Sequence, residues 1–514
     1  MQAAKKWTVV LLMLVLAAAT ALAGCSGSNK EAGGSASDGT AEGGSAQNGD
    51  GGGGSKPTLK ILQTYAKHNY DTPVTDFLEQ ATGYKVQYDM LPQDNAQDKL
   101  NLIMSSGADY DLVKAGKQDY FRFALNGALT DLTPLIDKYG PNIKTAISEK
   151  SFDAVKVDGK IYAIPDMNTS YVGGGIMVRT DWLDKLGMKM PTTTDEFTAM
   201  LKAFKEKDPA GNGSQNIPFT ISGTVPLVDG LLGAFGLYNA WNPEDGKLVN
   251  RALDSKLKDY LTYMKSLYDE GLLDKEFATN KEETADQKFT SGRAGAEYVP
   301  WYKIPNLDEA LKKNVPGAEY AYIPVIAGPN GEQGYGVGQG FDWYMIVPAT
   351  AKHPEDAIKY INATLEPNTF KEMYIGKEGV DYKVENGEYL PIQPAFFDDR
   401  GYSSDYTMGR DEEHFQDYWQ ARLRKSDAMF EAFKQINDID DSLKKPDVLG
   451  FSTFLPKLAQ DSQKLDNMVI DYSVKAIVSG VTDSGLKDFQ NQWLQAGGEA
   501  VTKEVNDWYA QQQQ

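Results

Sequence analysis

The chain has 514 residues, 41% hydrophobic and 11% aromatic, which is the composition of a globular protein too long for one ordinary core. With 52 Lys and Arg against 72 Asp and Glu, the formal net charge is −20, and such a surface repels the phosphates of nucleic acids. The sequence holds one cysteine, Cys25, which excludes an intrachain disulfide and a Cys-x-x-Cys metal site.

The N-terminal segment has the layout of a secretory signal. Lys5 and Lys6 give it a positive start, and an apolar run follows that small residues close just before Cys25. We therefore expect residues 1–24 to be removed as a signal peptide. The alternative is an uncleaved membrane helix, since the run is near the ~17-residue lower limit for crossing a bilayer.

The segment after Cys25 predicts a tether. Residues 26–55 are rich in Gly, Ser and other small or polar residues and hold nothing more apolar than alanine. Such a segment cannot bury enough surface to offset the entropy of ordering it. We expect residues 25–56 to form a flexible link, and no later apolar run approaches bilayer length.

Strands and helices alternate in the next part of the chain. Strand patterns occur at 59–62, 86–90 and 111–113. Helix signals lie between them, at 73–83 from Pro73 to Gly83 and at 100–104. This order predicts a parallel sheet covered by helices. A second series comprises a strand at 161–165, a strand at 176–179 and helices at 180–187 and from 191, the last with capping residues at its start.

The loops after the first and third predicted strands are candidate binding segments, because ligands of open α/β sheets lie at the carboxyl ends of the strands. The first loop, 63–70, contains Tyr65 and His68, and the second, 114–119, contains Lys117. Both are polar with an aromatic or basic element, as a sugar site requires. The alternative is that they are ordinary solvated loops.

Two family resemblances emerge from motifs along the chain. Leu22-Ala23-Gly24-Cys25 resembles the lipobox of bacterial lipoproteins, whose cysteine carries a diacylglycerol. Residues 175–187, continuing through 191–197, resemble the Asp-Trp-Leu, Lys-Leu-Gly, Pro-Thr-Thr, Glu-Phe run of extracellular solute-binding proteins of carbohydrate ABC importers. Further matches follow in the family's order, at 208–213, 268–274, 289–295, 352–357 and 376–382.

The resemblance implies an α/β, two-lobed periplasmic-binding-protein-like fold of type II. Each lobe would be a mostly parallel sheet flanked by helices, with a hinged cleft between the lobes. By the same analogy, residues 57–168 plus 333–398 form the first lobe, and residues 169–332 plus 399–510 form the second.

Sugar chemistry selects aromatic and polar residues within this frame, because a sugar packs its C–H faces on rings and offers hydroxyls to polar groups. Trp301 follows a predicted strand where family members carry a stacking aromatic residue, and Tyr302 is next to it. Trp343, with Asp342 beside it, and Trp241 are further candidates. The alternative for each tryptophan is a place in the core.

Two glycine-containing segments need interpretation. Asp208 to Asn216 resembles the short calcium loop of some relatives, with Asp208 and Asn212 as candidate ligands. Because Ala210 stands where an oxygen ligand is expected, we favour a plain turn without metal. Residues 334–340 are glycine-rich but lack the Lys-Ser/Thr ending of a phosphate loop, and we interpret them as a flexible crossing.

These observations together predict a lipoprotein on the extracellular face of a Gram-positive cell membrane. It would bind a saccharide, in the form of an oligosaccharide, and deliver it to an ABC permease driven by a separate ATPase, itself being a monomer without a cofactor. The alternatives are a lipoprotein sugar sensor and a secreted glycan-acting enzyme, although no Gly-x-Ser-x-Gly or His-Glu-x-x-His motif occurs.

Overall fold

The computed structural model describes residues 56–66, 68–93, 95–107, 109–168, 170–424 and 426–513. The predicted signal peptide, Cys25 and the tether up to Ser55 therefore lie outside the described residues. Within the described ranges, no helix combines the length and the apolarity needed to cross a membrane.

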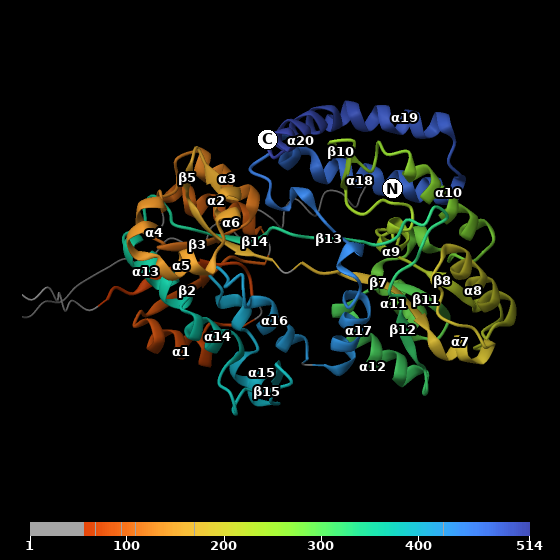
Figure 1. The fold of residues 1–514 in the computed structure, drawn as a ribbon, viewed down its shortest axis with the longest axis horizontal. Helices are drawn as coiled ribbons and strands as arrows, with labels where there is room; N and C mark the ends of the chain where they lie inside the picture. The colour runs from red at the N-terminus through yellow and green to blue at the C-terminus, as the bar shows by residue number, and fades with distance from the viewer. Residues whose placement is uncertain are drawn as a thin grey trace, which may run out of the picture. The chain divides into compact units, whose positions relative to one another are not determined.

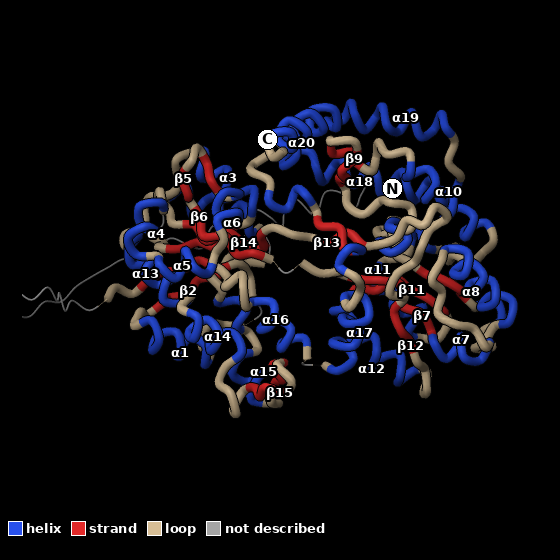
Figure 2. The backbone as a smooth tube through the Cα atoms, in the orientation of Figure 1, coloured by secondary structure: helices blue, strands red, loops and turns tan. Residues whose placement is uncertain are grey.

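The first sheet contains five strands in the order β2–β1–β3–β14–β6 (Figures 1 and 2). Their bounds are Val86–Met90, Leu59–Gln63, Leu112–Ala115, Phe341–Ile346 and Ala163–Met167. β1 pairs in parallel with β2 and β3, whereas β14 is antiparallel to β3 and β6. The predicted alternation is confirmed, with α1 (Pro73–Thr82) and α2 (Ala96–Ser106) between these strands. As expected, α1 begins at Pro73 and ends at Gly83, whose φ of 69° suits glycine.

The second sheet contains four strands in the order β12–β7–β11–β8. Their bounds are Tyr320–Tyr322, Gly174–Arg179, Ala294–Pro300 and Ile217–Thr220. β7 is antiparallel to both β12 and β11, and β11 is parallel to β8. This sheet is thus mixed, in contrast to the expectation of mostly parallel strands, because β11 and β12 both run against the central strand β7.

Helices cover both sheets, and the chain's last helices pack together beside the second (Figure 1). α3 (Lys117–Leu125), α6 (Glu149–Ala154), α13 (Pro354–Thr364), α14 (Pro367–Ile375) and α16 (Phe415–Leu423) pack around the first sheet. The helices around the second sheet include α7 (Thr180–Leu186), α8 (Thr194–Lys207), α10 (Lys256–Asp269), α11 (Glu282–Thr290), α12 (Ile304–Asn314), α17 (Asp427–Asn437), α18 (Pro456–Ser479), α19 (Asp483–Trp493) and α20 (Glu499–Gln511).

Each sheet has its own hydrophobic core. The first core draws residues from 59–164 and 344–421, and the second from 176–326 and 449–508. A third cluster joins β7 and β11 to α12 and α17. The lobe boundaries expected from the sequence stay a prediction, but Tyr406 and other residues up to Ala421, beyond the expected division at 398, pack into the first core.

Part of the glycine-rich crossing forms a strand, and its flexibility stays a prediction. β13 (Tyr335–Val337) pairs in parallel with β17 (Lys444–Pro446). A Cβ atom on Gly336 would lie 2.1 Å from the carbonyl oxygen of Tyr238. The glycine therefore serves close backbone approach, and larger side chains are excluded there.

Candidate functional site

Polar and aromatic side chains form a row across the edge of the first sheet where β1, β3 and β6 end and β14 begins. The row consists of Gln63, Lys114, Trp343 and Asp166, which we call the polar row. In the strand register Trp343 pairs with Asp166, and Lys114 pairs with Met345, two residues from Trp343. Side chains of paired residues point to the same face, and the Nζ atom of Lys114 lies 5.6 Å from the centroid of the Trp343 ring.

Charged side chains gather at the polar row. The Nε atom of Arg410 lies 2.7 Å from an oxygen of Asp166, which is fully buried, and its Nη2 lies 2.9 Å from an oxygen of Asp342. Burial raises the pKa of Asp166, and the guanidinium of Arg410 opposes that rise. Burial also lowers the pKa of Lys114, against the attraction of nearby carboxylates.

One amide of the row has no partner. Gln63 is 1% exposed, and neither its amide nitrogen nor its amide oxygen has a hydrogen-bond partner among the described residues. A buried amide without a partner costs about 1–3 kcal/mol, which a structure tolerates most readily where a ligand or water satisfies it.

The loop after β1 extends this site with a second set of rings. The His68 ring stacks on Tyr402 with 4.1 Å between centroids, and its Nε2 lies 2.7 Å from an oxygen of Asp405. Tyr65 and Tyr402 remain 44% and 52% exposed. The structure thus brings the predicted residues Tyr65 and His68 to the expected end of the strand, beside two residues that sequence reasoning missed.

An aromatic cluster stands at the other end of the segment 166–172, which leads from β6 towards β7. It comprises Tyr171, Trp301, Trp419 and Phe433. The Trp301 ring lies 5.5 to 5.9 Å from the three other rings, edge to face. Trp301 is 6% exposed and part of the third core cluster, whereas its neighbour Tyr302 is 60% exposed. Trp419 is a further residue that sequence reasoning missed.

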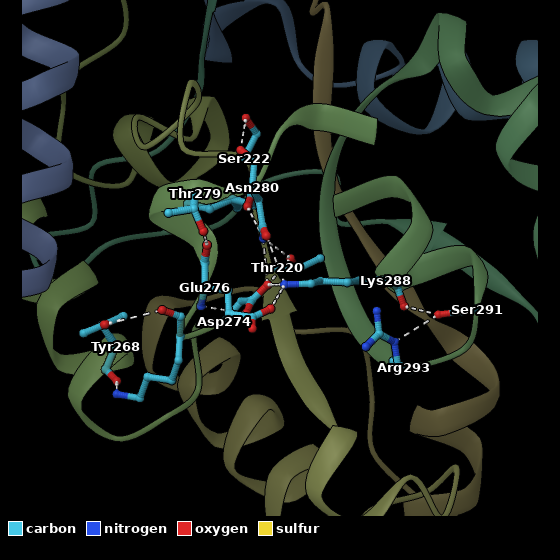
Figure 3. Close-up of polar contacts among 12 residues, drawn as sticks. Thr220, Ser222, Tyr268, Asp274, Glu276, Thr279, Asn280, Lys288, Ser291 and Arg293 are labelled. Carbon is cyan, nitrogen blue, oxygen red and sulfur yellow. Dashed lines mark hydrogen bonds and ion pairs between the residues drawn. The ribbon is translucent and has the colours of Figure 1, made fainter. Parts of the chain in front are cut away.

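A buried polar network fixes the segment after β8 (Figure 3). The Nζ atom of Lys288 lies 2.8 Å from Asp274 and donates to the side-chain oxygen of Asn280 at 3.0 Å. Asn280 in turn donates to the carbonyl of Ile221 at 3.2 Å and accepts from the amide of Gly223 at 3.0 Å. The network therefore positions the backbone at the carboxyl end of β8.

The structure does not bring Trp241 to the polar row. Trp241 opens β9 (Trp241–Glu244), is 4% exposed and packs in the second core. Its strand borders a groove of about 1150 Å³, which we call the rear groove. α6 and Phe451 contribute to the other side of that groove.

The rear groove and the polar row lie on opposite faces of β14. A bulge between Phe341 and Trp343 turns Phe341 towards Phe451, at 5.3 Å between centroids, while Trp343 faces Lys114. Amides in the groove bond to the protein's own backbone: Asn239 donates to the carbonyl of Lys445 at 3.0 Å and Gln339 to that of Asp447 at 2.7 Å. We therefore place the candidate site at the polar row.

Lys117 lies on the groove side and not in the row. The predicted loop 114–119 is in fact the end of β3, Gly116 and the first turn of α3. Lys117 donates to the hydroxyl of Ser452 at 3.1 Å. Burial lowers its pKa to about 8, and Asp447 opposes this shift.

The depressed pKa of Lys117 predicts a pH effect on stability. In the unfolded chain a lysine titrates near ~10.4, so between about pH 8 and pH 10 the unfolded state binds more protons and the free energy of unfolding rises with pH. Urea denaturation at both ends of that range should show a smaller rise in Lys117→Met than in wild type. The exposed Lys247→Met serves as the control, and equal rises in all three proteins would contradict the prediction.

The loop proposed as a weak calcium candidate uses its carboxylate internally. Asp208 accepts hydrogen bonds from the backbone amides of Asn212 at 2.9 Å and Gly213 at 2.7 Å. The side chain of Asn212 donates to the carbonyl of Gly292 at 2.8 Å. In the described part of the chain, no group of three His, Cys, Asp or Glu side chains gathers as a metal site. The oxygens of Asp208 thus stabilise the turn itself.

Comparison with known proteins places these features in a family. A model described as bacterial extracellular solute-binding protein matches residues 60–367, more than half of the chain. Lipoprotein LipO of Bacillus subtilis is 26% identical over 98% of this chain and 98% of its own length. The polygalacturonan/rhamnogalacturonan-binding protein YtcQ of the same species is 24% identical over 98% of this chain and 99% of its own.

A third relative has a solved structure. The fructooligosaccharide ABC transporter substrate-binding protein FusA of Streptococcus pneumoniae is 31% identical over 61% of this chain and 62% of its own. Its structure in complex with kestose covers 89% of this chain and 99% of that chain, with a TM-score of 0.68 at 23% identity. The two-lobed α/β fold expected from the sequence is therefore confirmed, and the chain belongs to the family of bacterial extracellular solute-binding proteins.

Proposed function

We propose that the chain is an extracellular receptor that binds an oligosaccharide between the polar row and the aromatic cluster. The observation that supports this most is the half-buried Trp343 ring beside Lys114 and Asp342. A sugar offers apolar C–H faces to such a ring and hydroxyl groups to the charged side chains around it. The segment 166–172 connects this surface directly to Trp301 and its neighbours, which gives a second aromatic surface for a longer ligand.

The relatives support the same class of ligand. FusA is named for fructooligosaccharide and was solved with kestose, and YtcQ is named for polygalacturonan and rhamnogalacturonan. The family consists of solute-binding proteins and not of enzymes. We therefore propose that this chain binds its saccharide without changing it and without a cofactor, hinging closed on the ligand as a monomer.

Transport requires other chains. The sequence has no Gly-x-x-x-x-Gly-Lys-Ser/Thr loop for a nucleotide. The proposed partners are accordingly an ABC permease and its cytoplasmic ATPase, to which the closed receptor delivers its sugar. A lipoprotein sugar sensor is the second candidate, and stimulation of permease ATPase activity by the loaded receptor in vesicles distinguishes the two.

A ligand screen tests the proposed function. The full chain, purified in detergent, is mixed with neutral and acidic oligosaccharides in EDTA and, separately, in excess calcium, and both the melting temperature and the glycan are analysed. We expect a rise in melting temperature with an unchanged glycan, because a ligand that binds the folded state stabilises it. Hydrolysed glycan would instead identify an enzyme, and a rise that requires calcium would contradict binding without a cofactor.

Replacement of Cys25 tests the proposed membrane anchor. Cys25→Ser removes the thiol that would accept the lipid, so we expect either release from the membrane or an unprocessed precursor. LipO, the Bacillus relative, is named a lipoprotein, which supports this expectation. Membrane fractionation with mass spectrometry of the N-terminus provides the measurement, and Ser26→Ala is the matched control. Correctly cleaved Cys25→Ser protein that stays in the membrane would refute the anchor.

A further inference from the structure

Carboxylates outnumber cations beside Trp343 among the described residues. Lys114 and Arg410 are the described cations of this surface, and Asp166, Asp342 and Asp405 are the carboxylates that act on them. Three carboxylates thus face two cations in the described part of this surface. Asp405 also contacts His68, which carries charge only when it is protonated.

Each nitrogen of the Arg410 guanidinium lies close to an oxygen of the protein. Its Nε contacts Asp166 at 2.7 Å, its Nη2 contacts Asp342 at 2.9 Å, and its Nη1 donates to the carbonyl of Met167. Recognition of a carboxylate by arginine relies on two parallel N–H groups of that fork. A sugar acid would therefore have to compete with Asp166 and Asp342 for that fork.

A lysine beside the second surface is paired with carboxylates. Lys303, two residues after Trp301, lies 3.0 Å from an oxygen of Asp286 and 3.1 Å from one of Glu282. The carboxylate of an acidic ligand would have to give up its hydration water beside protein groups whose net charge is zero or negative. This desolvation weakens its binding. Hydroxyl groups do not meet this cost, because they donate to carboxylates and accept from ammonium groups.

We infer that the site is specific for uncharged saccharides and discriminates against uronates. Asp342, whose side chain is 42% exposed, would accept from a sugar hydroxyl beside the Trp343 ring. Arg410 would act as a positioning residue that holds Asp342 in place. This inference rests on the proposed function and decides between relatives whose names point to different ligands, fructooligosaccharide for FusA and polygalacturonan for YtcQ.

Calorimetric titration of the full chain in detergent tests the inference. The probes are the uncharged kestose, xylotriose, mannotriose and galactotriose, and the acidic trigalacturonate and trimannuronate. We expect the tightest binding from an uncharged probe, with each acidic probe weaker by at least about tenfold, and an affinity that changes little between low and high salt. An acidic probe that binds tightest overturns the inference but leaves the saccharide receptor standing. Binding of no probe contradicts the proposed function and this inference with it.

A charge variant provides an independent readout. Asp342→Asn keeps the shape of the side chain and removes one negative charge, while Asp166 still holds Arg410. The ratio of uronate to neutral affinity should rise by about threefold or more, because one opposing carboxylate is gone. Asp245→Asn makes the same change in net charge at an exposed turn and should leave the ratio unchanged. An unchanged ratio in Asp342→Asn would overturn the role of the charges.

Discussion

Replacing Trp301 by alanine should lower the free energy of unfolding by about 3–5 kcal/mol, the cost of deleting a large buried aromatic side chain. Trp301 is 6% exposed and packs edge to face against Tyr171, Trp419 and Phe433. The change therefore leaves a cavity that these rings cannot fill without moving. Urea denaturation followed by far-UV circular dichroism provides the measurement.

The neighbouring tyrosine supplies the control. Tyr302 is 60% exposed, so Tyr302→Ala should change the free energy of unfolding by no more than about 0.5 kcal/mol. The sequence alone predicts that Trp301→Ala weakens sugar binding and leaves the fold intact, and the packing adds a loss of stability to that expectation. Unchanged stability of Trp301→Ala with lost affinity would contradict a core role and support a ligand contact alone.

Replacing Lys288 by methionine should destabilise the protein by about 3–5 kcal/mol, because it leaves a buried carboxylate without its cation. Lys288 and Asp274 are 3% and 6% exposed, and 2.8 Å separates their charged atoms. Burial alone would raise the pKa of Asp274, but hydrogen bonds from Lys288, from the amide of Glu276 and from other groups outweigh it and hold the pKa below its ordinary value.

The pH dependence of the free energy of unfolding of Lys288→Met tests whether the unpaired carboxylate of Asp274 causes the loss of stability. A depressed folded pKa contributes stability at neutral pH that is lost as the pH falls through the folded pKa. Lys288→Met should therefore lose less stability on acidification below about pH 4 than wild type does. Lys312→Met removes an ion pair of similar geometry to Asp308 in which the lysine is 60% exposed, and should cost no more than about 1 kcal/mol. Equal losses in Lys288→Met and Lys312→Met would contradict this account of the buried network.

The ends of helices were predictable from the sequence where they depend on residues that are neighbours along the chain. The capping residues before Phe197 predicted a helix, and α8 begins at Thr194 with Thr193 accepting from the amide of Glu196 at 3.2 Å. Pro73 at the start of α1 and Gly83 at its end likewise predicted the limits of that helix. Tyr65 and His68 also follow β1 at the expected edge of the first sheet.

Contacts between distant segments were not predictable. Arg410 reaches Asp166 across 244 positions of sequence, and nothing near either residue indicates the pair. The sequence pattern assigned Lys114 to a loop, because charged residues are rarely buried, but the structure places it in the buried strand β3. The bulge that separates Phe341 from Trp343 also depends on pairing with β6, which no local pattern reveals.

The place of the binding site is the central claim, and one comparison of affinities tests it most directly. Calorimetric titration with the tightest-binding uncharged probe is performed on Trp343→Ala, at the polar row, and on Phe451→Ala, in the rear groove. We expect Trp343→Ala to weaken binding by about tenfold to a hundredfold, because a stacking face is lost, and Phe451→Ala to bind as wild type does. Full affinity in Trp343→Ala together with lost affinity in Phe451→Ala would move the site to the opposite face of β14 and contradict the account.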